Sequence, residues 1–341
     1  MILRRALLVL GALAPFAAQA QPARPRFYAR GTKQRAVRFA GSEGAELVGT
    51  LLLPIWSEIE KVPGVVLVAG SGPTDRDGNN ALVPDRIDLL KQIAQLLAEA
   101  GIASLRYDKR GIGASTSRPT GSVAEQERFF SWSNFVGDVA AAHAELVRHD
   151  EIKAYATALL GHSEGGLLVL AAAPTIARNP PHGMVLIATP GRKLADILRV
   201  QIARGAPGLV APADRAIAAI EATGHVPADL PRELGALFPP YAGPFLQRLL
   251  FFDPAQALAA SRLPCLVLQG AADRQIVPME DVQPLIDALG KRDAPGEAMV
   301  IPAASHNLKV AQWPTDAGFA GPIAPAAAAK LTSWMKQVLG A

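Results

Sequence analysis

Residues 159–166 read Leu-Leu-Gly-His-Ser-Glu-Gly-Gly, and they decide the fold of this chain. An apolar run at 156–160 predicts a strand before them, and residues 164–172 predict a helix after them. A Gly-x-Ser-x-Gly pattern at such a junction is typical of a nucleophile elbow, a sharp turn that lifts a serine hydroxyl above the edge of a sheet. As a bare pentapeptide it also fits an ordinary Gly-rich turn. At this junction it makes Ser163 the candidate nucleophile, at a helix end that favours negative charge.

Apolar runs on both sides of the elbow alternate between strand-like and helix-like patterns. Strands are predicted at 47–53, 65–69, 102–107, 156–160, 183–187, 263–268 and 298–301. Helices are predicted at 85–100, 130–148, 164–172 and 326–339. Strands that alternate with helices of this length predict an α/β fold, with a mostly parallel sheet covered by helices on both faces.

The segment 189–262 interrupts this alternation, because it contains no strand-like run. Helices are predicted within it at 194–204, 212–223 and 245–251. Loops at the carboxyl ends of parallel strands surround the ligand crevice, so we expect an inserted helical lid, with a helical decoration that does not touch substrate as the alternative. The predicted division is a signal peptide at 1–20, a core at 21–188, the lid at 189–262 and a second core part at 263–341.

A serine nucleophile needs a base, and the base needs an orienting acid. His306 lies in a loop after the last predicted strand, at the same sheet edge as the elbow, and is the candidate base. Asp273 follows the strand at 263–268 at that edge and is the candidate acid. Asp281 and Asp287 fall in or near the next helix and are expected to be solvated. The other histidines lie elsewhere along the chain, at His143, His149, His162, His182 and His225.

The oxyanion of an acyl-transfer reaction needs two backbone donors. One is expected to be the N–H of Glu164, directly after the nucleophile. The other is expected to come from the Gly-rich loop at 70–73, from the N–H of Ser71 or alternatively of Gly72. A phosphate-binding loop is the competing interpretation of this segment, but it lacks the Walker lysine and the Rossmann glycine spacing.

Composition excludes several other classes of protein. The chain has 341 residues, of which 50% are hydrophobic, so it is neither disordered nor collagen-like. Its single cysteine, Cys265, forms no intramolecular disulfide or cysteine zinc site, and we expect it to pack in a buried strand. No His, Asp or Glu cluster has metal-ligand spacing, so neither a metal nor a cofactor is expected. The basic stretch at 24–38 lacks a periodic or aromatic pattern, and no nucleic-acid partner is expected.

The first 20 residues are typical of a secretory signal peptide. Arg4 and Arg5 precede an apolar run at 6–18, and Ala18-Gln19-Ala20 is a small-x-small cleavage site. Cleavage after Ala20 lowers the formal charge from +4 to +2. The apolar run is too short to span a membrane, although an uncleaved anchor is the alternative. We expect a periplasmic or secreted protein without a stable membrane anchor.

Three further segments resemble one known family. Residues 70–78, 106–115 and 270–278 are similar to the oxyanion segment, a strand-following turn and the acid loop of a bacterial esterase subgroup, related to acyl-peptidase and dienelactone-hydrolase-like proteins. With the elbow, they make the chain resemble a serine esterase of the α/β-hydrolase superfamily over nearly all of residues 40–340. The order Ser163, Asp273, His306 matches that arrangement. A serine at the elbow excludes relatives with an aspartate nucleophile, the haloalkane dehalogenases and epoxide hydrolases.

The resemblance implies cleavage of small-molecule carboxylic esters through an acyl-enzyme intermediate. Charged residues of the matching motifs are expected to fix their loops through hydrogen bonds; these are Asp75, Arg76, Asp77, Asp108 and Arg110. One alternative is an aminopeptidase or acyl-peptidase, whose lid would need an acidic residue for a peptide N-terminus, such as Glu221 or Glu233. Another is a catalytically silent binding protein of the same fold. The oligomeric state is not predicted.

Overall fold

The computed structural model describes residues 31–55, 61–83, 85–313 and 316–341. The predicted signal peptide lies outside these residues.

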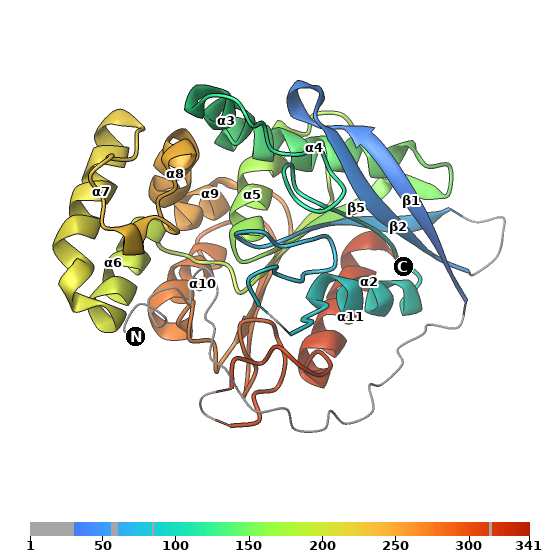
Figure 1. Cartoon of the computed structure of the whole chain (residues 1–341). Helices are drawn as coiled ribbons and strands as arrows, with labels where there is room; N and C mark the ends of the chain where they lie inside the picture. The colour runs from blue at the N-terminus through green and yellow to red at the C-terminus, as the bar shows by residue number, and fades with distance from the viewer. Residues whose placement is uncertain (1–30, 56–60, 84, 314–315) are drawn as a thin grey trace.

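An eight-stranded sheet forms the centre of the protein, in the order β1-β2-β4-β3-β5-β6-β7-β8 (Figure 1). The pairs β1–β2 and β2–β4 are antiparallel, and all other neighbours are parallel. The strands are β1 Thr32–Ala40, β2 Glu46–Pro54, β3 Val62–Val68, β4 Ala103–Tyr107, β5 Ile152–His162, β6 Gly183–Ile187, β7 Cys265–Gly270 and β8 Gly296–Ile301. The predicted class, a mostly parallel sheet with helices on both faces, is confirmed.

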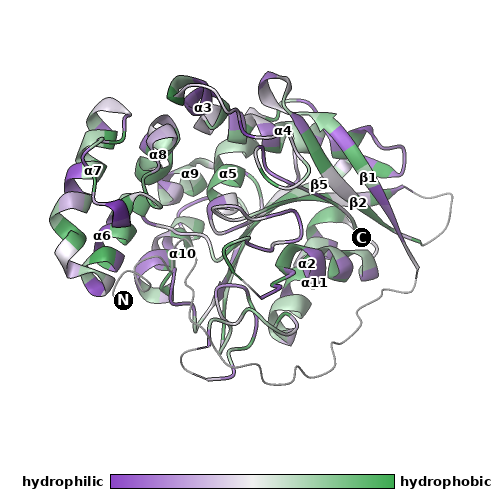
Figure 2. Ribbon diagram, viewed as in Figure 1, coloured by the Kyte–Doolittle hydropathy of each residue, from purple (hydrophilic) through white to green (hydrophobic). Residues whose placement is uncertain are grey.

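Helices cover both faces of the sheet, because successive side chains of its buried strands point to opposite faces. Val66 and Val68 of β3 pack in a cluster with α4, α5, α9 and α10, whereas Val65 and Leu67 pack on the other face with α2 and α11. Figure 2 shows hydrophobic colour on the central strands and hydrophilic colour on outward-facing parts of the helices. The helices of the core are α2 Leu89–Glu99, α4 Trp132–Arg148, α5 Glu164–Ala172, α9 Pro254–Ala260, α10 Gln283–Leu289 and α11 Pro325–Leu339. A further helix, α3 Val123–Phe129, has no buried residue and packs against the segment between β6 and β7.

Three helices between β6 and β7 lie in the segment predicted to be the lid, and their buried side chains share a hydrophobic cluster. They are α6 Leu194–Gly205, α7 Val210–Thr223 and α8 Gly243–Phe251. Leu167 of α5 joins this cluster, so the lid rests on the helix that follows the elbow. The next helix, α9, packs on the sheet side through Leu258. The predicted boundary at 262 stays a prediction. The hydrophobic cluster shared by α6, α7 and α8 includes no buried residue of α9.

Some predicted boundaries differ from the structure for local reasons. The helix predicted from residue 85 begins only at Leu89, because Asp88 has a left-handed φ of 49° and the Asn79 side chain accepts the N–H groups of Ile87 and Asp88. Strand β1 and the short helices α3, α9 and α10 were not predicted. Within the described ranges, no helix is both long and apolar enough to cross a membrane.

Candidate active site

The nucleophile elbow has the strained geometry that its glycines allow. Ser163 has φ 54° and ψ −122°, which is unfavourable for a residue with a side chain. A Cβ atom on Gly161 would overlap the backbone of Gly165, and one on Gly165 would overlap the carbonyl oxygen of Val68. Gly161 and Gly165 therefore lie too close to neighbouring backbone to carry a side chain. The turn leaves Ser163 partly exposed, at the start of α5.

The Gly-rich loop after β3 lies directly beside the elbow. Strands β3 and β5 are neighbours, with Val68 opposite Gly161, at the point where the chain changes direction across the sheet. A Cβ atom on Gly70 would lie 3.1 Å from the His162 ring and 3.4 Å from the Ser163 Cβ. Within the described residues, the N–H groups of Ser71, Gly72 and Glu164 have no hydrogen-bond acceptor. The structure thus brings together all the donors considered for the oxyanion, and Gly72 stays an alternative to Ser71.

His306 and Asp273 form a buried hydrogen-bonded pair. The Nδ1–H group of His306 donates to Oδ2 of Asp273 at 2.8 Å, and the Asp273 side chain is 0% exposed. Burial raises the pKa of Asp273, but the adjacent His306 and the hydrogen bonds to the carboxylate outweigh it and hold the pKa below its usual range. Asp273 is thus an ionised acceptor that fixes the His306 tautomer, leaving Nε2 free to accept a proton.

Further hydrogen bonds hold the Asp273 carboxylate in place. Oδ1 accepts from the backbone N–H groups of Gln275 and Ile276, at 2.8 and 3.0 Å. The Gln269 amide donates to Oδ2 at 2.9 Å. Sequence reasoning did not find Gln269. Its place four residues before the acid, at the end of β7, was the available signal.

Ser163 and His306 line the same cavity. The structure records no hydrogen bond between them. In the free state of an enzyme such a bond is often long, and it tightens when substrate binds.

The remaining histidines do not compete for the role of base. Burial, and then the proximity of His306, lower the pKa of His162 to about 3, so this ring is neutral. Its Nε2–H donates to the His306 carbonyl at 3.0 Å, which fixes the His306 loop. The other four do not line the cavity.

One expectation about the acidic residues is wrong. Asp287 is exposed as predicted, but Asp281 is only 3% exposed. The Arg192 guanidinium donates to the Asp281 carboxylate at 2.6 Å, and the Val277 N–H donates to it at 2.8 Å. Asp281 is therefore a buried structural carboxylate that joins the start of the lid segment to the acid loop.

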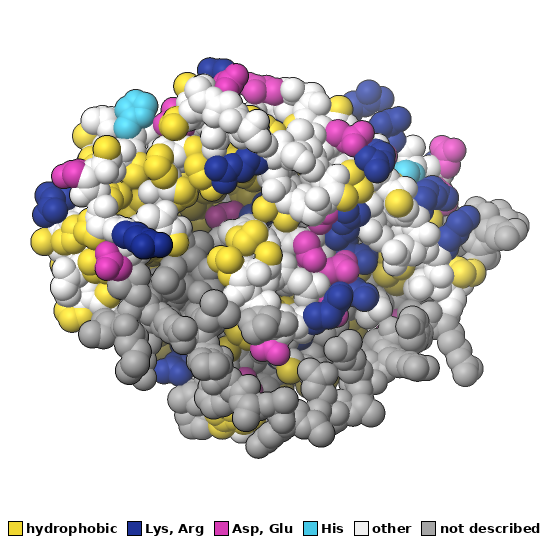
Figure 3. All heavy atoms as spheres, in the orientation of Figure 1, with side chains coloured by type: hydrophobic (Ala, Val, Ile, Leu, Met, Phe, Trp, Pro, Cys, Tyr) yellow, Lys and Arg dark blue, Asp and Glu magenta, His cyan; other side chains and the backbone are white. Residues whose placement is uncertain are grey.

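A cavity of about 670 Å³ lies between the elbow and the lid. Its walls are mostly apolar, and they come from α4, α5, the lid and the loop after β4. Figure 3 shows hydrophobic side chains around a hollow on this face of the molecule. The volume suits a drug-sized ligand. The lid segment therefore contacts the candidate site, which argues against a purely decorative role.

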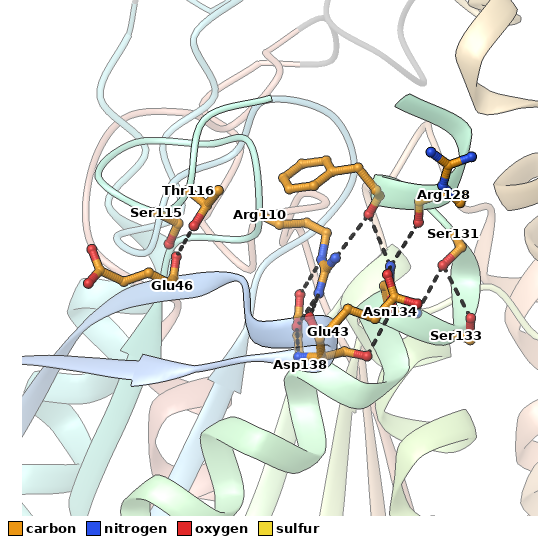
Figure 4. Close-up of polar contacts among 12 residues, drawn as sticks. Glu43, Glu46, Arg110, Ser115, Thr116, Arg128, Ser131, Ser133, Asn134 and Asp138 are labelled. Carbon is orange, nitrogen blue, oxygen red and sulfur yellow. Dashed lines mark hydrogen bonds and ion pairs between the residues drawn. The ribbon is translucent and has the colours of Figure 1, made fainter. Parts of the chain in front are cut away.

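Three cations line the cavity, and two of them are paired with carboxylates. Lys109 is 3.0 Å from the Glu164 carboxylate. Arg110 forms two 2.7 Å hydrogen bonds with Asp138, in the network drawn in Figure 4. Arg118 has no carboxylate partner among the described residues, and its guanidinium carbon lies 4.5 Å from the centre of the Tyr241 ring.

The charged motif residues fix their loops as expected. Arg76 donates to Asp108 through both its backbone N–H and its guanidinium, at 2.8 and 2.5 Å. Asp77 accepts from Arg106 at 2.7 Å. Asp75 accepts the N–H groups of Asp77 and Asn79 within its own loop. These bonds join the loop after β3 to β4 and the turn that follows it.

The described residues contain no group of three or more histidines, cysteines or acidic residues arranged to hold a metal ion. Cys265 is buried in β7, and burial raises the pKa of its thiol to about 12. It is a packed side chain rather than a reactive thiol.

Comparison with known proteins agrees with this geometry. Residues 85–213 match the serine aminopeptidase family S33. Esterase EstD of Thermotoga maritima is 37% identical over 142 residues, a stretch that covers 41% of this chain but only 30% of EstD. A puromycin-hydrolyzing peptidase of Mycobacterium tuberculosis superposes with a TM-score of 0.59 at 19% identity, over 91% of this chain and 40% of that one. The α/β hydrolase GrgF of Penicillium superposes with a TM-score of 0.56 at 17% identity, over 91% of this chain and all of GrgF.

The sheet order, the strained serine between β5 and α5, and the superpositions define the fold. The chain has the fold of the α/β hydrolases, and residues 85–213 are similar to the S33 family. Its relatives include proteins described as esterases and proteins described as peptidases.

Proposed function

We propose that this protein is a serine hydrolase that cleaves carboxylic esters through an acyl-enzyme intermediate. The observation that carries the proposal is the buried His306–Asp273 hydrogen bond, at a cavity that also contains the strained Ser163. Similarity to an esterase supports the choice of ester.

In the proposed mechanism, the Ser163 hydroxyl attacks the ester carbonyl while Nε2 of His306 takes its proton. The ionised Asp273 accepts the Nδ1–H of the resulting imidazolium. The N–H groups of Ser71 and Glu164 donate to the oxyanion of the tetrahedral intermediate. His306 returns the proton to the leaving alcohol, and water then hydrolyses the acyl-enzyme by the same steps.

Amide cleavage is the second candidate, and the match to the S33 aminopeptidase family favours it. An aminopeptidase needs a carboxylate for the cationic peptide N-terminus. Glu221 and Glu233 are both exposed and neither lines the cavity. Glu164 does line it, but it is paired with Lys109. Among the described cavity residues, no unpaired carboxylate is present for a peptide amine, which supports the ester.

The test is hydrolysis of p-nitrophenyl esters of graded acyl length, beside amino-acid arylamides. Ester turnover should dominate. Ser163→Ala and His306→Ala should each lower kcat by about 10⁴-fold or more, and Asp273→Asn by about 10⁴-fold. The exposed His225→Ala is the matched control and should leave kcat unchanged. Full activity of Ser163→Ala would overturn the proposal. Faster turnover of arylamides than of esters would favour a peptidase.

A catalytically silent binding protein is the remaining alternative. Folded protein should react with a fluorophosphonate probe at Ser163, and Ser163→Ala should not. Absence of labelling in folded wild-type protein would favour the silent protein.

We also propose export to the periplasm or beyond, on the strength of the signal-like sequence at 1–20. N-terminal sequencing of protein from an exporting bacterial host should start at Gln21. A chain that retains Met1 would contradict this.

A further inference from the structure

Lys109 occupies a position between the two segments proposed to bind the oxyanion. It lies in the loop after β4 and is only 4% exposed. Its Nζ atom donates to the Gly70 carbonyl at 2.6 Å and to the Glu164 carboxylate at 3.0 Å. One ammonium group therefore joins the loop after β3 to the first residue of α5. No pattern in the sequence alone indicates a role for this lysine.

The bond to Gly70 has a direct consequence for Ser71. The carbonyl of Gly70 and the N–H of Ser71 belong to one peptide group, and in a planar trans peptide these two bonds point in opposite directions. Lys109 holds the carbonyl on one side, and it thereby directs the N–H of Ser71 to the other. The ammonium also polarises this peptide group through its hydrogen bond to the carbonyl, which makes the Ser71 N–H a stronger hydrogen-bond donor.

This peptide group needs an external support, because its neighbours are flexible. Gly70 and Gly72 flank Ser71, and Gly72 has a positive φ of 69°. On the far side, the Ser71 carbonyl accepts the Thr74 hydroxyl at 2.7 Å. Lys109 supplies a bond to the preceding peptide group, so the peptide groups on both sides of the Ser71 Cα atom are each held by one hydrogen bond.

The bond to Glu164 serves the second donor. Glu164 contributes its backbone N–H to the proposed oxyanion site and its side chain to Lys109. The ion pair lies in a poorly hydrated place, with side-chain exposures of 5% for Lys109 and 10% for Glu164. A buried ammonium without a partner would be strongly unfavourable. The carboxylate thus gives the Lys109 ammonium a partner and fixes its position.

We infer that Lys109 is a positioning residue for the oxyanion site, which fixes the Ser71 and Glu164 N–H groups relative to each other by bonding to Gly70 and Glu164. The inference rests on the proposed acyl-transfer function. It differs from a role in substrate binding, because the support acts only when negative charge develops on the carbonyl oxygen.

The test is the variant Lys109→Met, which keeps the length of the side chain but removes the charge and the donors. Removing one oxyanion donor costs about 10²–10³-fold in kcat. Loss of a support for that donor should cost less, and we expect a fall of about 10–100-fold in kcat with KM within about threefold. The inhibition constant of an aryl trifluoromethyl ketone should rise by the same factor, because its Ser163 adduct carries an oxyanion. Circular dichroism and the thermal midpoint verify folding.

Two further variants keep the inference falsifiable if Lys109→Met does not fold. Lys109→Arg retains charge and donors and should recover part of the lost kcat. Glu164→Gln keeps the backbone N–H but weakens the ion pair, and it should lower kcat and trifluoromethyl ketone affinity together.

Unchanged kcat in folded Lys109→Met, or a rise in KM alone, would overturn the inference. Failure of the esterase proposal has a different signature, since wild-type protein itself would not cleave esters. In that case the comparison is made with arylamides, which pass through the same oxyanion, and equal rates of wild type and Lys109→Met would again overturn the inference.

Discussion

The buried ion pair between Arg110 and Asp138 allows a sharp prediction about stability. Both side chains are only 1% exposed, and two 2.7 Å hydrogen bonds join them. Asp138 also accepts the Ser42 N–H at 2.9 Å, and Arg110 donates to the carbonyls of Ser42 and Phe129 (Figure 4). The pair therefore joins the loop after β4 to the β1–β2 turn, α4 and the end of α3.

We expect Asp138→Asn to lower the free energy of unfolding by about 3–5 kcal/mol, which is the usual cost of removing one partner from a buried pair. The substitution leaves the Arg110 guanidinium without a counter-charge. It also places amide N–H groups against guanidinium N–H groups, so at least one buried donor loses its acceptor.

The assay is urea unfolding at pH 7, followed by circular dichroism. The matched control is Glu46→Gln, which breaks the exposed Arg38–Glu46 pair, whose side chains are 65% and 57% exposed. That change should cost less than about 1 kcal/mol. The double variant Arg110→Met/Asp138→Met should be less destabilised than Asp138→Asn, because no buried charge remains unpaired.

A loss in Asp138→Asn no larger than that in Glu46→Gln would refute this reasoning. A double variant Arg110→Met/Asp138→Met that is destabilised more than Asp138→Asn would refute it as well, because the unpaired charge would then not be the cause of the loss.

Three further outcomes are expected. Gly161→Ala should abolish activity and destabilise the fold, because its Cβ meets backbone that cannot move; wild-type activity in this variant would contradict the elbow geometry. The three atoms nearest to a Cβ on Gly166 all belong to the Thr189 side chain, and Thr189→Ala removes the two that lie closest. Activity lost in Gly166→Ala should therefore return in part in Gly166→Ala/Thr189→Ala, and no recovery would count against this difference. Burial, and then the proximity of a second histidine, lower the pKa of His143 to about 4 from 6.5, so the unfolded chain binds this proton first as the pH falls. Urea unfolding should therefore show that the free energy of unfolding falls by about 2 kcal/mol from pH 7 to pH 5 because of this group. His143→Gln should remove this pH-dependent loss, whereas the exposed control His225→Gln should retain it. Identical pH profiles of stability for the wild type and both variants would contradict the prediction.

Periodicity was sufficient to predict the parallel strands, and together with the Gly-x-Ser-x-Gly pattern it predicted the elbow. Strands β3 and β6 are buried on both faces, so their sequences are unbroken apolar runs that stand out from their neighbours. Strand β1 was missed because it lies at the sheet edge and has mostly exposed side chains. Helix α10 was missed because seven residues are too few for a helical pattern to emerge.

The polar residues around the site were harder to predict, because burial depends on distant partners. Asp281 is predicted to be solvated because its partner, Arg192, lies 89 positions earlier in the chain. Lys109 reaches a carboxylate 55 positions away. Such pairs leave no periodic signal in a single sequence. Ser163, Asp273 and His306 could be proposed only because each follows a recognisable strand.

Arg118, which stacks on Tyr241 and has no carboxylate partner among the described residues, affects which ligands the cavity attracts. The pairs Lys109–Glu164 and Arg110–Asp138 cancel their charges, so the uncompensated Arg118 gives the described cavity lining an excess positive charge at an exposed position. A unit charge about 4 Å from this guanidinium would gain or lose about 1–4 kcal/mol, depending on hydration. A ligand with a carboxylate tail would therefore be drawn toward the cavity, whereas a ligand with an ammonium group would be repelled. Raising the salt concentration should weaken this selection by charge without affecting the bond-breaking chemistry.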